Sequence, residues 1–153
     1  MLSELITSDV IRVHPQATDW QDAVKKSCQA LIDNGAVEAR YVDAIFRSHQ
    51  ELGPYYVIGP GMAMPHARPE DGVNRLALAI TVIQQGVHFD SEGNDPVKGN
   101  DPVKMLVTLA ATDSNSHVGA IAKLAELFMN EEHVEQICQA QTPDDVLAVI
   151  KNY

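Results

Sequence analysis

The chain has 153 residues, a hydrophobic share of 45% and a formal net charge of −10. The length suits one ordinary domain, and the composition is typical of a globular protein rather than a disordered one. The acidic balance argues against nucleic acid as a partner, because phosphate contacts need clustered basic residues, and it favours partners with positive patches.

The N-terminal residues MLSELITSDVIRV contain neither the basic region nor the continuous apolar run of an export signal. No later segment approaches the ~20 apolar residues that cross a bilayer. No Ser/Gly-rich linker divides the chain. We therefore expect a single domain over residues 1–153, located in the cytoplasm and not inserted in a membrane.

Two helices are expected in the first third of the chain. The first covers residues 18–35, where Thr18 has capping-box spacing to Gln21 and a glycine stands at the end. The second covers residues 38–53 and is stopped by the Gly53-Pro54 pair.

Four segments have the character of strands. The two later ones are almost wholly apolar, which suits strands buried on both faces in a sheet covered by helices. The two earlier ones are short and are separated by a Gly-Pro-Gly turn. In chain order, the segments are residues 55–59, 62–66, 76–83 and 105–112.

Two further helices are expected after the last strand. Residues 116–128 are amphipathic, and residues 142–153 begin with Thr142 as N-cap and Pro143 as the first helical residue. Helices that alternate with buried strands predict an α/β sandwich. The periodicity does not distinguish a parallel sheet from a mixed one.

The hexapeptide GNDPVK occurs at residues 93–98 and again at residues 99–104. Two copies of six residues are too short for a repeat architecture. Asn-Asp-Pro is turn chemistry, so we expect a lengthened surface loop before a strand that starts near Val103, and we assign this loop no functional role.

His66 is the first candidate functional residue. It lies between Pro65 and Pro69 in the segment GPGMAMPHARPEDG, directly after a strand-like segment. Prolines hold such a loop at low entropic cost, and scaffold-positioned loops carry many catalytic residues. Arg68 adds a permanent positive charge whose planar fork suits an oxyanion or a phosphate.

His117 is the second candidate. It follows TDSNS at the start of the helix expected over 116–128, where Asp113, Ser114 or Ser116 is available as N-cap. A helix N-terminus attracts anions and disfavours imidazolium, so we expect a neutral ring that donates a hydrogen bond. Each histidine follows an apolar strand, so the two can meet at one edge of the sheet.

The chain lacks a P-loop, the Rossmann glycine spacing, G-x-S-x-G and H-E-x-x-H. A nucleophilic histidine that accepts a phosphoryl group fits best, since phosphoryl transfer mainly demands positioning and charge stabilisation. A metal-dependent hydrolase that uses His66, His117 and Asp113 is the alternative from another class of protein.

The segments PGMAMPHARPEDG and NDPVKMLVTLAATDSNSH, with the amphipathic helix after them, resemble the IIA components of the bacterial sugar phosphotransferase system. The type is mannitol/fructose, and the ascorbate members look closest. The resemblance implies an α/β sandwich with a mixed sheet and flanking helices. It implies that His66 accepts phosphate through Nε2 and that His117 hydrogen-bonds it. Beyond the resemblance, we expect Arg68 and Ser116 to bind the phosphate.

The resemblance also implies the partners. The donor is the phosphocarrier protein HPr, the acceptor is a cysteine of a cognate IIB component, and the IIC membrane channel then phosphorylates the sugar. No cofactor or metal is implied. The sugar and the oligomeric state, a homo-oligomer included, stay open, and a regulatory phosphohistidine sensor of the same fold is the second hypothesis.

One departure from the family concerns the helix before the Pro-His motif. Many members carry an Arg-Glu pair there, whose arginine reaches the phosphate. This chain has Arg47, Ser48 and His49 instead. We therefore do not assign Arg47 to the site, and we expect Arg68 to take over its role.

Overall fold

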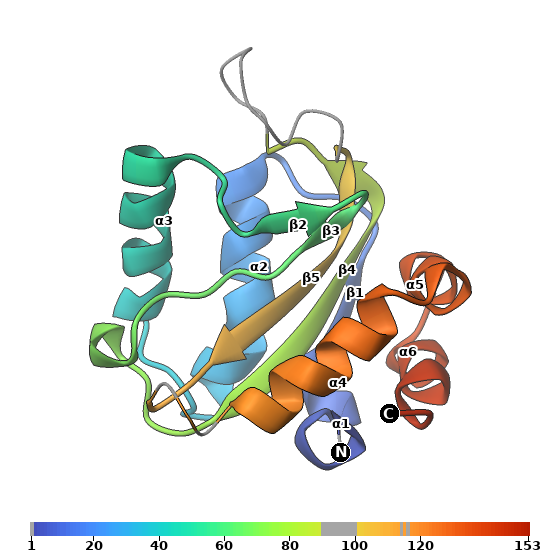
Figure 1. Cartoon of the computed structure of the whole chain (residues 1–153). Helices are drawn as coiled ribbons and strands as arrows, with labels where there is room; N and C mark the ends of the chain where they lie inside the picture. The colour runs from blue at the N-terminus through green and yellow to red at the C-terminus, as the bar shows by residue number, and fades with distance from the viewer. Residues whose placement is uncertain (1, 90–100, 114, 116) are drawn as a thin grey trace.

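The computed structural model describes residues 2–89, 101–113, 115 and 117–153. Five strands form one sheet in the order β1-β4-β5-β3-β2 (Figure 1). The pairs β1/β4 and β3/β5 are parallel, and the pairs β4/β5 and β2/β3 are antiparallel, so the sheet is mixed. The strands are β1 (Ile11–His14), β2 (Val57–Gly59), β3 (Met62–Ala63), β4 (Ala77–Val87) and β5 (Val103–Ala110).

Helices cover the sheet from two sides. Figure 1 shows α2 and α3 on the left of the central strands and α1, α4, α5 and α6 on the right. Both α2 and α5 contact β4 and β5. The expected α/β sandwich is thereby confirmed. The helices are α1 (Leu2–Leu5), α2 (Trp20–Asp33), α3 (Arg40–Leu52), α4 (Val118–Phe128), α5 (Glu131–Cys138) and α6 (Pro143–Ile150), with short 3-10 turns at Ser8–Val10 and Pro69–Asp71.

The two central strands form the core, as their apolar runs predict. Each residue from 78 to 83 in β4 is at most 1% exposed. Because alternate residues of a strand point to opposite faces, both faces of β4 are buried. The polar core side chain of Thr108 donates to the carbonyl oxygen of Ser27 in α2 at 2.8 Å. This bond satisfies a buried hydroxyl and ties β5 to the helix over it.

The helix ends differ in part from the sequence prediction. Helix α2 begins one residue later than its predicted cap implies, because Asp19 is the N-cap and accepts from the backbone N–H of Asp22 at 2.8 Å. The predicted cap at Thr18 is therefore wrong. The cap of α6 is confirmed, since the Thr142 side chain accepts from the backbone N–H of Asp145 and a proline opens the helix.

Strand β5 begins at Val103, as predicted, whereas β3 is shorter than predicted and ends at Ala63. The first GNDPVK copy, residues 93–98, lies outside the described residues. The short elements α1, β1 and α5 were not predicted. None of the helices in the described part of the chain has the length and apolar character to span a bilayer.

Candidate active site

His66 lies on the loop between β3 and the 3-10 turn at Pro69–Asp71, and it is half-buried. The backbone N–H of Leu109 in β5 donates to the carbonyl of Pro65 at 3.2 Å, which holds this loop beside the end of β5. The ring Nδ1 lies 2.7 Å from the carbonyl oxygen of Met64. A carbonyl oxygen only accepts, so Nδ1 carries the proton and a neutral ring bears its lone pair on Nε2.

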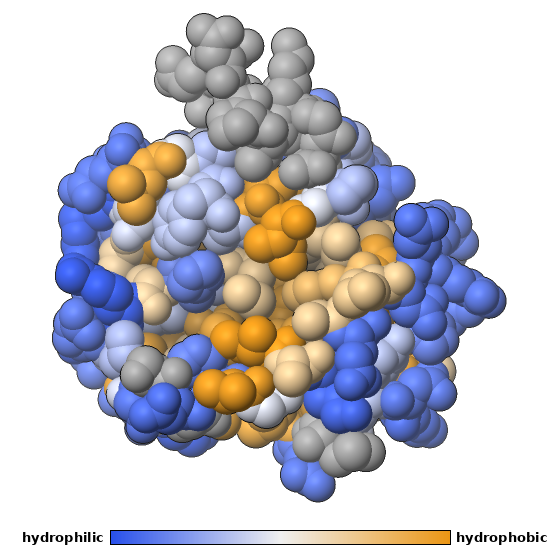
Figure 2. All heavy atoms as spheres, viewed as in Figure 1, coloured by the Kyte–Doolittle hydropathy of each residue, from blue (hydrophilic) through white to orange (hydrophobic). Residues whose placement is uncertain are grey.

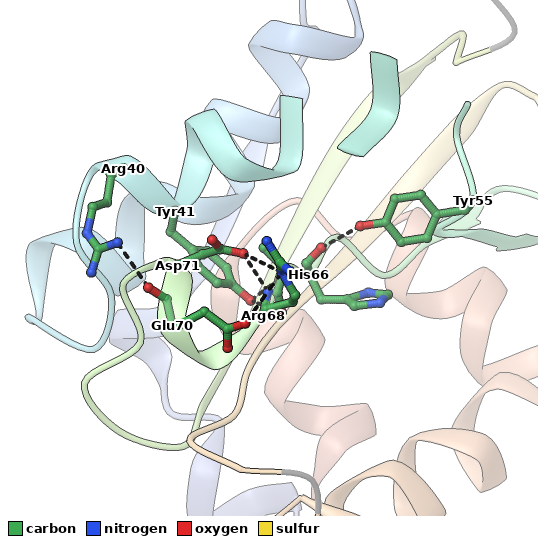
Figure 3. Close-up of polar contacts among 8 residues, drawn as sticks. Arg40, Tyr41, Tyr55, His66, Arg68, Glu70 and Asp71 are labelled. Carbon is green, nitrogen blue, oxygen red and sulfur yellow. Dashed lines mark hydrogen bonds and ion pairs between the residues drawn. The ribbon is translucent and has the colours of Figure 1, made fainter. Parts of the chain in front are cut away.

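Two tyrosines hold the peptide unit between His66 and Ala67. The Tyr55 hydroxyl donates to the carbonyl oxygen of His66 at 2.8 Å (Figure 3). The Tyr41 hydroxyl accepts from the Ala67 N–H at 2.9 Å and donates to the Leu109 carbonyl at 2.7 Å. Tyr41 is fully buried, and burial raises the pKa of its hydroxyl far above the ordinary value, so the hydroxyl keeps its proton. The backbone at the candidate nucleophile is thus fixed from the core and from the surface.

His66 and His117 line the same cavity. The two residues are 51 positions apart in a chain of 153, and the structure brings them together at the end of β5, as their places after two strands suggested. The volume of the cavity is about 250 Å³. Its lining consists of His66, Ala67, Arg68, Pro69, Leu109, Ala111, Asp113 and His117.

The ring of His117 is oriented in the same way as that of His66. His117 stands at the N-cap position of α4, makes no side-chain cap, and has its Nδ1 3.0 Å from the carbonyl oxygen of Asp113. Nδ1 is therefore the donor here too. A neutral His117 presents only a lone pair at Nε2, so it can donate from Nε2 only as imidazolium. The expected neutral ring would therefore donate its one proton to the Asp113 carbonyl rather than into the cavity.

Arg68 lines the cavity but its guanidinium is engaged by carboxylates. Its Nε lies 3.6 Å from Glu70 Oε1 and 3.6 Å from Asp71 Oδ2, and 76% of its side chain is exposed (Figure 3). Ion pairs at such exposure are weak, so an incoming dianion can compete for this arginine. Ser116, the other predicted phosphate ligand, lies outside the described residues.

One further charged residue, Arg40, supports the loop and does not line the cavity. Arg40 in α3 donates from Nη1 to the carbonyl oxygen of Glu70 at 3.0 Å and so ties the turn after His66 to the helix.

His49, on the same helix, is 5% exposed and stacks on Trp20 with 3.6 Å between the ring centroids. Its Nδ1 lies 2.6 Å from the Tyr56 hydroxyl. His49 is therefore a core residue.

Within residues 2–89, 101–113, 115 and 117–153, no group of three His, Cys, Asp or Glu side chains could hold a metal ion. Asp113 uses its backbone carbonyl to orient His117, and its Oδ1 accepts from the backbone N–H of Asn115 at 2.8 Å. The donor set imagined for a metal-dependent hydrolase therefore has no support from the described geometry.

Tyr41 and Tyr55 were not predicted from the sequence as site residues. Tyr41 is on the buried face of α3, where an aromatic residue normally serves as core. Tyr55 follows a Gly-Pro pair in what reads as the start of a strand. Their hydroxyl bonds to the His66 loop span 26 and 11 positions, so no local sequence pattern predicts them.

Residues 4–153, nearly the whole chain, match the family model described as "Phosphoenolpyruvate-dependent sugar phosphotransferase system, EIIA 2". The chain belongs to this family. The resemblance drawn from the Pro-His segment is confirmed, and the chain is an EIIA component of the mannitol/ascorbate type.

Individual EIIA relatives agree with this assignment. The chain is 40% identical over 149 residues to the "Mannitol-specific cryptic phosphotransferase enzyme IIA component" of Escherichia coli K12, covering 97% of each. It is 38% identical over 142 residues to the "Ascorbate-specific PTS system EIIA component" of the same organism, covering 92% of this chain and 88% of the relative.

A solved structure gives the same result for the fold. The solution structure of a mannitol-specific cryptic enzyme IIA from Escherichia coli superposes on this chain with a TM-score of 0.87, at 37% identity and 99% coverage of both chains. The sandwich with a mixed sheet is therefore that of the EIIA components.

Proposed function

We propose that this EIIA chain is a phosphoryl carrier in which Nε2 of His66 accepts a phosphoryl group from phospho-HPr. The group then passes to the cysteine of a cognate IIB component, and through it to sugar entering at the IIC channel. The observation that carries this proposal is the 2.7 Å bond from Nδ1 of His66 to the Met64 carbonyl. It leaves the lone pair of a neutral ring on Nε2, as a nucleophile requires.

The transfer needs no proton to leave Nε2. As the bond from Nε2 to phosphorus forms, the bond from phosphorus to the donor breaks, and the imidazole gains positive charge. The proton on Nδ1 stays in its bond to the Met64 carbonyl, which stabilises that charge. In the second step the thiolate of IIB attacks phosphorus, the bond to Nε2 breaks, and the neutral ring is restored.

His117 and Arg68 are placed to stabilise the phosphoryl group. Both line the His66 cavity, and the imidazolium form of His117 can donate to the group from Nε2. Arg68 exchanges exposed carboxylate partners for phosphate oxygens. Stabilisation by such exposed groups is moderate, and this suits a carrier that must also release the group, because only interactions stronger in the transition state accelerate transfer.

The surface around the cavity suits docking of protein partners. Figure 2 shows apolar side chains gathered between α3 and α4. On β2, Ile58 is 44% exposed, and Val118, next to His117, is 59% exposed. Met62 is buried and Met64 is half-buried, so the first of these methionines serves as core.

The names of the relatives favour transport over regulation. Two relatives at about 40% identity are named for mannitol and ascorbate, and neither is named a regulator. We place the protein in the cytoplasm, where a phosphocarrier and a IIB component are within reach.

Mass spectrometry of the intact protein tests the proposal. After incubation with phosphoenolpyruvate, Enzyme I and HPr, wild type should gain one acid-labile phosphoryl group and His66→Ala should gain none. His88→Ala, an exposed histidine that does not line the cavity, is the matched control and should be phosphorylated normally. A phosphorylated His66→Ala protein, or an unphosphorylated wild type beside phosphorylated HPr, would overturn the proposal.

A further inference from the structure

Tyr55 contacts both the backbone and the ring of His66. Its hydroxyl donates to the His66 carbonyl oxygen at 2.8 Å, and its ring lies edge-on to the imidazole, with 5.4 Å between centroids and an interplanar angle of 86°. The sticks in Figure 3 show the hydroxyl directed at this carbonyl. Tyr55 is 38% exposed, so its contact with His66 is made at the surface of the protein.

The Tyr55 side chain is itself held in place. Its ring packs edge-on against Tyr56 at 5.1 Å between centroids, and its backbone N–H donates to the Gly53 carbonyl at 2.8 Å. Burial raises the pKa of the hydroxyl, and the opposing effect of the Ser48 side chain is smaller. The hydroxyl therefore keeps its proton and donates a hydrogen bond to the carbonyl oxygen of His66.

The two tyrosines have different roles at the same peptide unit. Tyr41 is fully buried and links the Ala67 N–H to the Leu109 carbonyl inside the protein, so removing it disturbs the core. Tyr55 holds the carbonyl end of the unit from outside. Its loss leaves a carbonyl that water can reach, and the main consequence is a freer His66.

We propose that Tyr55 is a positioning residue for phosphoryl transfer, which keeps Nδ1 of His66 on the Met64 carbonyl and Nε2 directed to the partner. This inference rests on the proposed function of His66 as the carrier. The hydroxyl fixes the backbone of His66 and the ring limits rotation of the imidazole. Such fixation matters because a displacement of about 1 Å at a reacting atom can cost roughly 10²-fold in rate.

The test compares Tyr55→Phe and Tyr55→Ala with wild type in single-turnover phosphorylation by phospho-HPr. Loss of one neutral hydrogen bond should slow Tyr55→Phe roughly three- to tenfold. Loss of hydroxyl and ring should slow Tyr55→Ala on the order of 10²-fold. Leu52→Ala, which removes a 72% exposed apolar side chain three positions away, is the matched control and should react at the wild-type rate.

Nitrogen-15 NMR of the unphosphorylated proteins reports which ring nitrogen of His66 carries the proton. This position would not change if Tyr55 served only to stabilise the fold. Wild type and Leu52→Ala should show His66 with its proton on Nδ1, and Tyr55→Ala should show a mixture of the two neutral tautomers. Tyr55→Phe should keep part of both the rate and the tautomer preference that Tyr55→Ala loses, because it keeps the ring contact with His66.

The outcomes separate this inference from the proposed function. A wild type that phospho-HPr does not phosphorylate overturns the carrier role, whatever the tautomers are. A phosphorylated wild type whose two Tyr55 variants react at its rate, with the His66 proton unmoved, overturns the positioning role alone. Equal losses in Tyr55→Ala and Leu52→Ala overturn it as well, since the effect is then not specific to Tyr55.

Discussion

The position of one proton decides what each cavity histidine can do. In His66 and His117 alike, Nδ1 donates to a backbone carbonyl, of Met64 and of Asp113 respectively. The same constraint gives the two rings complementary roles, because a neutral ring offers a lone pair at Nε2 and only a charged ring offers a proton there. In the proposed function, the lone pair at Nε2 of His66 is the nucleophile, and an Nε2 proton on His117 is the hydrogen-bond donor.

We expect His117→Ala to accept phosphate from phospho-HPr and to be slow in passing it to IIB. Loss of one charge-assisted hydrogen bond to the phosphoryl group should slow the onward step roughly 10- to 100-fold. Rapid-quench measurement of both half-reactions checks this, with the distal variant His88→Ala as the control. Unchanged rates in both steps would make His117 a structural residue.

Residue types and their places after strands were enough to predict that the two histidines meet in one cavity. They were not enough to predict how the rings are held. The tautomers depend on the Met64 and Asp113 carbonyls, and the loop depends on Tyr41 and Tyr55. These contacts arise only once α3, β3 and β5 are folded against one another.

At the scale of elements, the long patterned segments and the two short strands β2 and β3 beside the Gly-Pro-Gly turn were predicted, whereas α1, β1 and α5 were not. Strands β4 and β5 and helices α2, α3, α4 and α6 follow from apolar runs, periodicity and caps. Strand β1 has four residues, including Arg12 and His14, and helix α5 has only two turns. These elements gain stability from packing rather than from local preference.

The connection between β4 and β5 should tolerate loss of one GNDPVK copy. Because the copies are adjacent and identical, deleting residues 93–98 or 99–104 yields the same protein. The remaining copy still supplies the aspartate of position 101, which accepts from the Phe89 N–H at 2.9 Å. It also supplies the valine of position 103, at which β5 begins. Loop-closure entropy should change the free energy of unfolding by less than about 1 kcal/mol.

Urea unfolding of the deletion protein measures this change. Phe89→Ala, which truncates a fully buried side chain beside the same connection, is the calibrating variant and should lose roughly 3–5 kcal/mol. A deletion as costly as Phe89→Ala would show that the repeat packs on the fold, contrary to its interpretation as a lengthened loop.

At the scale of the molecule, composition and element order predicted the sandwich but not the strand order. Pairing β1 with β4 and β3 with β5 brings together segments far apart in the chain, and periodicity carries no information about such pairs. The mixed sheet was expected only through the resemblance to EIIA components, which the superposition confirms.

The net charge of −10 predicts that the rate of encounter with a donor that has positive patches depends on salt. Attraction between opposite potentials speeds encounter, and salt screens it over a distance that falls from about 10 Å at 0.1 M to about 3 Å at 1 M. We therefore expect kcat/KM for phosphorylation by HPr to fall several-fold between about 0.05 and 0.5 M NaCl.

The first-order rate at saturating HPr should hardly change, because transfer inside the docked complex involves close groups that salt screens little. Stopped-flow kinetics across this range separates the two quantities. If kcat/KM is independent of salt, apolar contact around the cavity, and not charge, governs the encounter.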